Sequence, residues 1–460
     1  MNYNQLHNIA RIILFIMISV SFSNLIILGK PQKFIFFPFL FIFVFLAFFL
    51  RSKDKHIRPN SNRLSTPLII FLSIVFVTMI IRGFGLQIFG SEKINGFQYI
   101  QLALSAPLIF LLPRVDISAK QWYYVLVAMC MIGFLPLIAA TGLRLEMIPE
   151  YIDIYSLIDL EQDAKYLKSD SNITDIRNFS ARNAGNLFFV LALLKLKPAK
   201  FDVRTCIALL ISLLITALSG HRGHIIILLF MLVTFFVLKG DYKNVLLFLL
   251  ACSVILLMTP NLVQLLPYPI QRSLSWLPFI DVSEYSQYNA QDSIDWRVLI
   301  WQYGLKEVPK YWLVGKGLAY DPNSVPFFLP EHFAWAVRTT NYHNGPLSIL
   351  ITQGVAGFIS IAAFVIIACK RHLQFLRQQW NSNLLKHFHL TIFSLLLAGI
   401  ISFNVINGHI AVNLPKFFFL FAILEGLVAT DCCSVKASYK LNIFKSGKLK
   451  ALRLQVKERY

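Results

Sequence analysis

Charged residues are scarce in this sequence, and acidic residues are the scarcer kind. Asp, Glu, Lys and Arg together make up 14% of the 460 residues, against roughly 25% in soluble domains. The 23 acidic residues are outnumbered by 43 basic ones, and 57% of all residues are hydrophobic. Such a chain cannot cover a water-facing surface, which excludes a soluble globular protein. We predict an all-α protein that crosses a membrane many times.

Cysteine is rare as well, and the motifs of several enzyme classes are missing. The six cysteines fall in apolar segments or on the predicted cytoplasmic side, so no disulfide framework or zinc site is predicted. The sequence has no His-Glu-x-x-His or Cys-x-x-Cys motif for a metal, and no Gly-x-Ser-x-Gly motif for a serine nucleophile. We therefore expect neither a metal nor a cofactor. Paired carboxylates of the glycosidase type stay open, because one loop is rich in acidic residues.

Apolar runs of membrane-spanning length are what the sequence has in quantity. A bilayer core of ~30 Å needs about 20 apolar residues in a helix, and fewer where the bilayer is thin. By that measure we predict about twelve transmembrane helices, at approximately 9–28, 34–50, 66–81, 97–112, 122–141, 183–196, 205–219, 224–238, 244–260, 346–368, 388–406 and 415–430.

The charges between these runs predict the topology. Basic residues cluster in alternate connections, which marks those connections as cytoplasmic. The opposite side carries an acidic loop at about 143–181 and a large loop at about 261–344. Both termini are then cytoplasmic, and the basic excess needs no nucleic-acid partner. The predicted parts are the first nine helices, the large loop, three further helices and a basic tail, at 1–260, 261–344, 345–430 and 431–460.

Arg222 lies in a short turn between two predicted spans, at the outer membrane face. The turn reads Ser-Gly-His-Arg-Gly-His over residues 219–224. An arginine there can bind an anion at bilayer depth, which points to a phosphate ligand. The alternative is a side chain that reaches out to the phosphates of lipid headgroups.

Arg297 lies in the large loop, on a segment with helical spacing. Over residues 296–308 this spacing places Arg297, Trp301 and Leu305 on one face, so we predict an amphipathic helix lying on the membrane. The following Gly-Lys-Gly at 315–317 lacks the Lys-Ser/Thr pair of a phosphate-binding loop. The alternative for Arg297 is a solvated face with a cation–π contact.

His343 is followed by Asn-Gly-Pro, a sequence that caps and begins a helix. His343 should therefore lie at the N-terminus of the tenth span, where the helix dipole favours a bound anion and a neutral imidazole. A neutral histidine can act as a general base, although a lone loop histidine is often without any chemical role. Gly354 and Gly357, later in the span, predict close packing against a neighbouring helix. Two arginines and a histidine suit the displacement of a lipid diphosphate by a hydroxyl.

These three segments resemble the bacterial O-antigen ligase and O-antigen polymerase superfamily. Residues 343–357 match the ligase pattern of His-Asn, nine residues and Gly-x-x-Gly in full. Residues 219–223 look like the family's Ser-Arg-Gly turn, with a histidine before the arginine, and residues 296–317 look like its Arg, Trp, Pro and Gly-x-Gly segment. The resemblance covers about 200–360, and the predicted twelve spans with one large late loop are similar to the ligase architecture.

The resemblance implies a metal-independent, inverting glycosyltransferase of the bacterial inner membrane. It would move a glycan from undecaprenyl diphosphate to a sugar of the lipid A core on the periplasmic face. Arg222 and Arg297 would then bind the diphosphate, and His343 would orient or deprotonate the acceptor hydroxyl. The further candidate substrate-binding residues, of which two have no motif of their own, are Asn344, Trp301, Arg338 and Arg182.

Other activities fit the same residues. An O-antigen polymerase would use a second lipid-linked repeat as acceptor, and a protein O-oligosaccharyltransferase would use a protein hydroxyl. A lipid-linked glycan transporter is a different class, in which the arginines would line a path and no bond would break. The His-Asn-x9-Gly-x-x-Gly match and the single large late loop favour the ligase over these alternatives.

Overall fold

The described residues of the protein form a bundle of helices. In this computed structural model they are residues 5, 7–14, 26–27, 30–31, 41–45, 61–85, 93–115, 117–132, 134, 138, 179–195, 203–258, 263–275, 277, 280–321, 331–406 and 408–445. Within them, strand is confined to the two-residue pair β1 (Ile26–Ile27) and β2 (Lys30–Pro31). Most of the predicted span 34–50, nearly all of the acidic loop 143–181 and the end of the basic tail lie outside the described residues. The predicted all-α class is confirmed.

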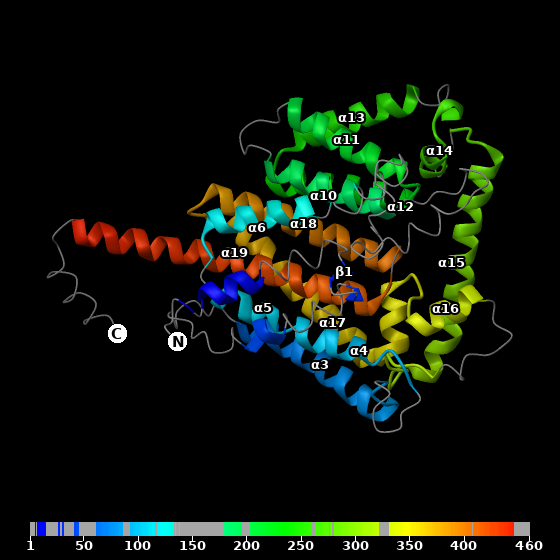
Figure 1. The fold of residues 1–460 in the computed structure, drawn as a ribbon, viewed down its shortest axis with the longest axis horizontal. Coiled ribbons are helices and arrows are strands. Elements are labelled where there is room, and N and C mark those ends of the chain that lie inside the picture. The colour runs from blue at the N-terminus through cyan, green and yellow to red at the C-terminus, as the bar shows by residue number, and fades with distance from the viewer. Residues whose placement is uncertain are drawn as a thin grey trace.

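Figure 1 shows the described helices in chain order. Their bounds are α3 (Ser61–Arg82), α4 (Phe97–Ser105), α5 (Leu108–Leu111), the 3-10 turn η2 (Leu112–Arg114), α6 (Ala119–Ile132), α10 (Phe179–Lys195), α11 (Val203–Leu218), α12 (Arg222–Lys239), α13 (Tyr242–Met258), the 3-10 turn η4 (Val263–Leu265), α14 (Tyr268–Leu274), α15 (Glu284–Tyr311), α16 (Glu331–Thr339), α17 (Gly345–Arg377), α18 (Asn383–Val405) and α19 (Ile410–Lys445).

Five helices of the described chain are long and apolar enough to cross a membrane: α3, α12, α17, α18 and α19. Each coincides with a predicted span, and α10, α11 and α13 are shorter helices at three other predicted positions. The predicted span 97–112 is broken into α4, α5 and η2, because Pro107 has no amide hydrogen to continue a helix. The total of twelve spans and the large loop's location stay predictions.

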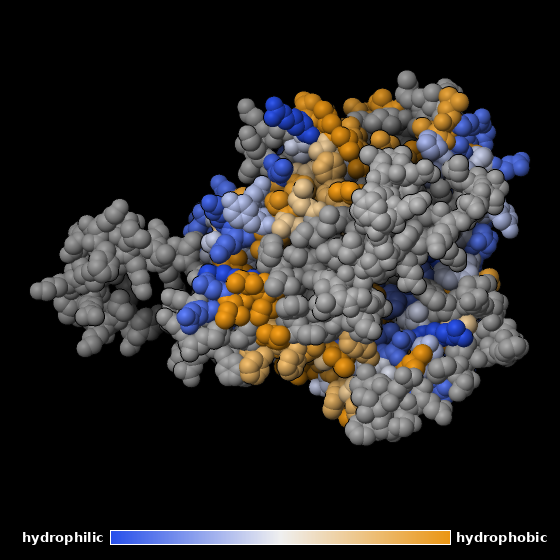
Figure 2. Space-filling model, in the orientation of Figure 1, coloured by the Kyte–Doolittle hydropathy of each residue, from blue (hydrophilic) through white to orange (hydrophobic). Residues whose placement is uncertain are grey.

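The outer faces of the bundle are apolar, as a protein in lipid requires. On α3 the exposed side chains include Ile69, Phe76 and Ile80, and α11 and α13 expose comparable rows of leucine, isoleucine and valine. Figure 2 shows hydrophobic residues gathered over α11 and α13 and along the edge formed by α3. Hydrophilic residues gather instead at the end of the molecule where α15 lies. An apolar surface this extensive indicates contact with lipid tails.

Helix α19 forms the centre of the bundle. Of its membrane-spanning part, 78% is buried, the largest share among the five candidate spans of the described chain. Phe418 and Phe421 of α19 stack edge-on against Phe364 of α17, with ring centroids 5.9 and 5.3 Å apart. Trp122 of α6 donates a hydrogen bond of 3.1 Å to Thr430 Oγ1, near the end of the candidate span Ile410–Cys432. Most side chains of this span are thus enclosed by protein.

Helix α17 is interrupted at Gly354, where the sequence predicts an unbroken span. Gly354 has φ of +69°, a conformation that glycine adopts without strain. The break frees backbone groups of α17 to bond to the segment after α15. Val355 N donates to Trp312 O at 2.7 Å, and Gly317 N donates to Thr352 O at 2.9 Å. The chain can lie this close to α17 only because residue 315 is glycine, since a Cβ there would lie 2.0 Å from Thr352 O.

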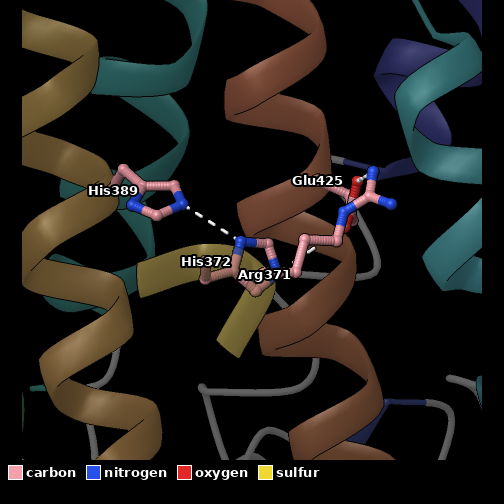
Figure 3. Close-up of polar contacts among 4 residues, drawn as sticks. All are labelled: Arg371, His372, His389 and Glu425. Carbon is pink, nitrogen blue, oxygen red and sulfur yellow. Dashed lines mark hydrogen bonds and ion pairs between the residues drawn. The ribbon is translucent and has the colours of Figure 1, made fainter. Parts of the chain in front are cut away.

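A buried ion pair joins α17 to α19 at the end remote from residue 343 (Figure 3). The Nε and Nη2 atoms of Arg371 lie 2.9 and 3.0 Å from the two carboxylate oxygens of Glu425. His372 lies 3.7 Å from the same carboxylate and bonds to His389 of α18 at 3.1 Å between ring nitrogens. All four side chains are enclosed, so this network ties three long helices together through polar contacts.

We expect the Arg371→Met variant to lose about 3–5 kcal/mol of stability, because it leaves the Glu425 carboxylate buried without its partner. The double variant Arg371→Met/Glu425→Met removes both charges and should recover most of that loss. Thermal unfolding of the detergent-solubilised chain measures both effects. A double variant as unstable as the single one would show that the pair itself, and not the stranded charge, carries the stability.

Candidate active site

The turn that carries Arg222 joins α11 to α12 as predicted. Gly220 has φ of +70°, so a residue with a side chain would be strained there. Arg222 is the first residue of α12, and its Nη2 donates a 2.6 Å hydrogen bond to Ala290 O of α15. The guanidinium is half-buried. The sequence therefore places an arginine at the end of the bundle, already directed toward α15.

Helix α15 runs across this end of the bundle, steeply inclined to α17 and α19 (Figure 1). It starts at Glu284, twelve residues before the predicted helix, and ends at Tyr311. Ala290 and Arg297 are seven residues apart, which places them on one face and about 10 Å apart along the axis. Arg222 is thus bound to the face of α15 that carries Arg297. The predicted helix is confirmed, and its position on a membrane surface stays a prediction.

His343 lies immediately before α17, where the sequence predicts it. Asn344 is the N-cap, and its Oδ1 accepts a hydrogen bond of 3.0 Å from Leu347 N. The Trp296 ring packs edge-on against His343 at 4.8 Å, which joins the histidine to α15. His343 has φ of +52°, a conformation unusual for a residue with a side chain. Capping and ring packing together fix the imidazole at this place.

The protonation of His343 follows from its surroundings. Its Nδ1 lies 3.0 Å from Ile406 O, and a carbonyl only accepts, so we assign the proton to Nδ1 and the lone pair to Nε2. Burial, opposed by the hydrogen bond to Ile406 O and helped by the charge of Arg297, lowers the pKa of His343 to about 4. His343 is therefore neutral at pH 7, with a basic nitrogen available in Nε2.

The turn between α18 and α19 packs against the start of α17, next to His343, and against the start of α12, next to Arg222. A Cβ at Gly408 would lie 2.4 Å from the carbonyl carbon of Asn344, so only glycine fits. A Cβ at Gly223 would lie 3.0 Å from Ile406 Cδ1, which brings the start of α12 against the same turn. The structure thus brings together Arg222, Arg297 and His343, which are far apart in the sequence.

Further basic side chains surround these three. The Nδ1 of His224 lies 3.0 Å from Asn186 Nδ2 of α10, and its ring is 6.1 Å from that of His221. Arg182 of α10 interacts electrostatically with His224. The pKa of His409 is lowered to about 4 by burial, by Lys416 and by His343. Sequence reasoning missed His224 and His409, since neither stands in a recognisable spacing.

The structure gives the surroundings of the four predicted substrate-binding residues, and their substrate contacts stay predictions. Trp301 packs with Ile300, Tyr342 and neighbouring apolar side chains between α15 and α17. Arg338 of α16 is exposed, and its carbonyl accepts a bond of 3.1 Å from Asn95 Nδ2. Asn344 serves as the cap of α17. Arg182 is the one residue of the predicted four that faces the His224 side of the group.

No three His, Cys, Asp or Glu side chains are grouped so as to hold a metal ion within the described parts of the chain. The arginine side chains of the site are fixed cations that can bind an anion. Arginine suits this purpose, since its planar fork matches two phosphate oxygens at once. A neutral imidazole beside such cations can take a proton from a hydroxyl group.

Comparison with known proteins agrees with this geometry. Residues 207–362 match the family model described as O-Antigen ligase. The matched part runs from α11 into α17, so it contains Arg222, Arg297 and His343. No curated protein matches the chain. This membrane protein with several apolar helices thus contains an O-antigen ligase domain at residues 207–362, and that domain indicates a glycosyltransferase-like enzyme of the O-antigen ligase and polymerase type.

Proposed function

We propose that the protein is an O-antigen ligase, an inverting glycosyltransferase that needs no metal. Its donor is a glycan on undecaprenyl diphosphate, and its acceptor is a sugar of the lipid A core oligosaccharide. The observation that carries the proposal is the convergence of Arg222 on α15, of Arg297 on that same helix and of a neutral His343 at the start of α17. Diphosphate binding and deprotonation of a hydroxyl need these groups side by side.

The reaction is a single displacement at the anomeric carbon of the donor. The acceptor oxygen forms a bond to that carbon while the bond to the diphosphate oxygen breaks from the opposite face, which inverts the configuration. The proton of the acceptor hydroxyl passes to Nε2 of His343, and the electron pair leaves with the diphosphate. Arg222 and Arg297 stabilise the charge of this leaving group, and that electrostatic contribution is usually the largest in such a step.

The chain is proposed to span the bacterial inner membrane with both termini in the cytoplasm. The ends of α11, α12, α17, α18 and α19 that meet at α15 would then face the periplasm, where the donor is presented. Basic residues in the predicted cytoplasmic connections support this orientation. Arg182 is proposed as a further contact to the donor. The substrate contacts of Trp301, Arg338 and Asn344 remain part of the proposal.

An O-antigen polymerase is the second candidate, because the matched family belongs to a superfamily of both activities. Its donor chemistry would use the same three residues, and its acceptor would be another lipid-linked repeat. A protein hydroxyl is the acceptor in the third candidate, an O-oligosaccharyltransferase.

Deletion of the gene in its host distinguishes these acceptors. We expect lipid A core without polymer on a lipopolysaccharide gel, together with long polymer still attached to the carrier lipid on a glycan blot. Core that bears a single repeat would assign the protein as the polymerase. An unchanged lipopolysaccharide ladder would contradict both and direct attention to protein glycosylation or to transport of the lipid.

A further inference from the structure

Lys416 is a charged residue inside the span of α19 to which no motif assigns a role. It stands six residues after the start of α19, which places it about 9 Å into the helix. Its neighbours Leu414, Pro415, Phe417 and Phe418 are buried, whereas Lys416 itself is exposed. Lys416 is therefore one of the side chains of α19 that the surrounding helices leave open.

The titratable neighbours of Lys416 belong to other elements of the bundle. Lys416 interacts electrostatically with Arg182 of α10, with His224 of α12 and with His409 before α19. These three partners belong to separate elements at the site end of α19, so Lys416 lies close to the candidate site.

The charge around Lys416 is unbalanced within the described residues. Its electrostatic partners there are cationic or neutral at pH 7, and none is acidic. Among the described residues its Nζ takes part in no ion pair. A lysine within a membrane span is costly without a counter-charge, so positions of this kind mark functional sites. Lys416 therefore offers a binding site for an anion.

We propose that Lys416 binds the phosphate of the donor that is attached to the polyprenyl chain. The inference rests on the proposed function and extends it to a residue outside the three motifs. Lys416 lies deeper along α19 than His409, whereas Arg297 and His343 stand at the end of the bundle. The prenyl chain must remain in the membrane, so its own phosphate occupies the deeper position. The sugar-bound phosphate then lies between Arg222 and Arg297.

This arrangement gives the lysine a defined part in the displacement. When the sugar leaves the diphosphate, negative charge grows on the phosphate that was bound to the sugar, and the second phosphate shares it. A compact ammonium group beside that second phosphate stabilises the leaving group as a point charge. Lys416 touches the donor and thus would count among the binding residues of the reaction.

The test compares two probes, farnesyl monophosphate and farnesyl diphosphate, on the full chain in lipid nanodiscs. We expect Lys416→Met to weaken both probes by about 10–100-fold, since each contains the prenyl-bound phosphate and one charge-assisted contact is lost. Lys416→Arg should retain most of the affinity. Arg297→Ala should weaken the diphosphate more than the monophosphate. Lys306→Met, which removes an exposed lysine of α15, is the matched control and should change neither.

The outcomes distinguish a wrong donor from a wrong role of Lys416. If the wild-type chain binds neither probe, the proposed donor is wrong and the role of Lys416 fails with it. If Arg222→Ala weakens the diphosphate while Lys416→Met leaves both probes unchanged, the donor stands and the role of Lys416 is overturned. We expect Lys416→Met without ligand to unfold at the same temperature or higher, because it removes repulsion from Arg182. Lower thermal stability with unchanged affinity would instead reveal a structural lysine.

Discussion

Arg222→Ala and Arg297→Ala should each reduce glycan transfer by about 10²–10³-fold, the usual effect of removing one preorganised contact to a developing charge. Arg222 holds α15 through its bond to Ala290 O, and Arg297 lies two turns further on the same face. Both guanidinium groups stand where the diphosphate would leave. The measurement is transfer in membranes from cells that express each variant in a deletion background, with protein levels determined by immunoblot.

Lysine at either position should recover part of the activity, because it restores the charge without the two-pronged contact to phosphate. Arg204→Ala is the control for the loss of an arginine as such, since Arg204 is exposed at the opposite end of α11. Transfer at the wild-type rate by Arg297→Ala would remove that residue from the proposed site. Arg222→Ala requires a second check, since thermal unfolding must show that α15 remains in place.

His343→Gln should abolish transfer while it leaves donor binding intact, because glutamine fills a similar volume but cannot accept the hydroxyl proton as a base. We further expect transfer by the wild-type enzyme to be level from about pH 8 to pH 5 and to fall only as pH approaches 4. Burial and Arg297 hold the pKa of His343 at about 4, so the imidazole stays neutral over that whole range. The pH profile of transfer and the affinity for farnesyl diphosphate are the two measurements.

The stability of the folded chain should also depend on the protonation of His343. The pKa of His343 is lower in the folded chain than the value of about 6.5 for a histidine in water. The unfolded chain therefore takes up the proton first, and stability is lost as pH falls from about 6.5 toward 4. An acidic limb of the transfer profile centred near pH 6.5 would show that the base is an ordinary exposed histidine. Full activity of His343→Gln would exclude His343 as the base altogether.

Local patterns determined much of what the structure shows. The short sequence at 219–224 predicts a turn between two apolar helices, and this turn puts Arg222 at the first position of α12. The Asn-Gly-Pro sequence after His343 begins α17 by capping, which depends on a few adjacent residues only. Apolar length alone predicted the positions of the five long helices, because a helix in lipid must satisfy its own backbone groups.

Some features needed contacts between distant segments. The break of α17 at Gly354 exists because the backbone of 312–317 supplies the hydrogen bonds that the helix gives up. The packing of the partly buried Trp301 depends on where α16 and α17 lie, which its spacing within α15 does not indicate. The sequence pattern predicts a helix at Gly354, but it does not reveal that the backbone of residues 312–317 stabilises the break.

The sequence by itself determined that this is a helical membrane protein with an O-antigen ligase domain, and that Arg222, Arg297 and His343 are its candidate chemistry. Those properties depend on composition and on residues close together in the chain. Tertiary structure alone decided that α12, α15, α17 and the turn before α19 meet at one end, that burial keeps His343 neutral, and that Lys416 has Arg182, His224 and His409 as electrostatic neighbours. The physical reason is that burial and electrostatic neighbours are set by segments far apart in the sequence, and no local spacing encodes them.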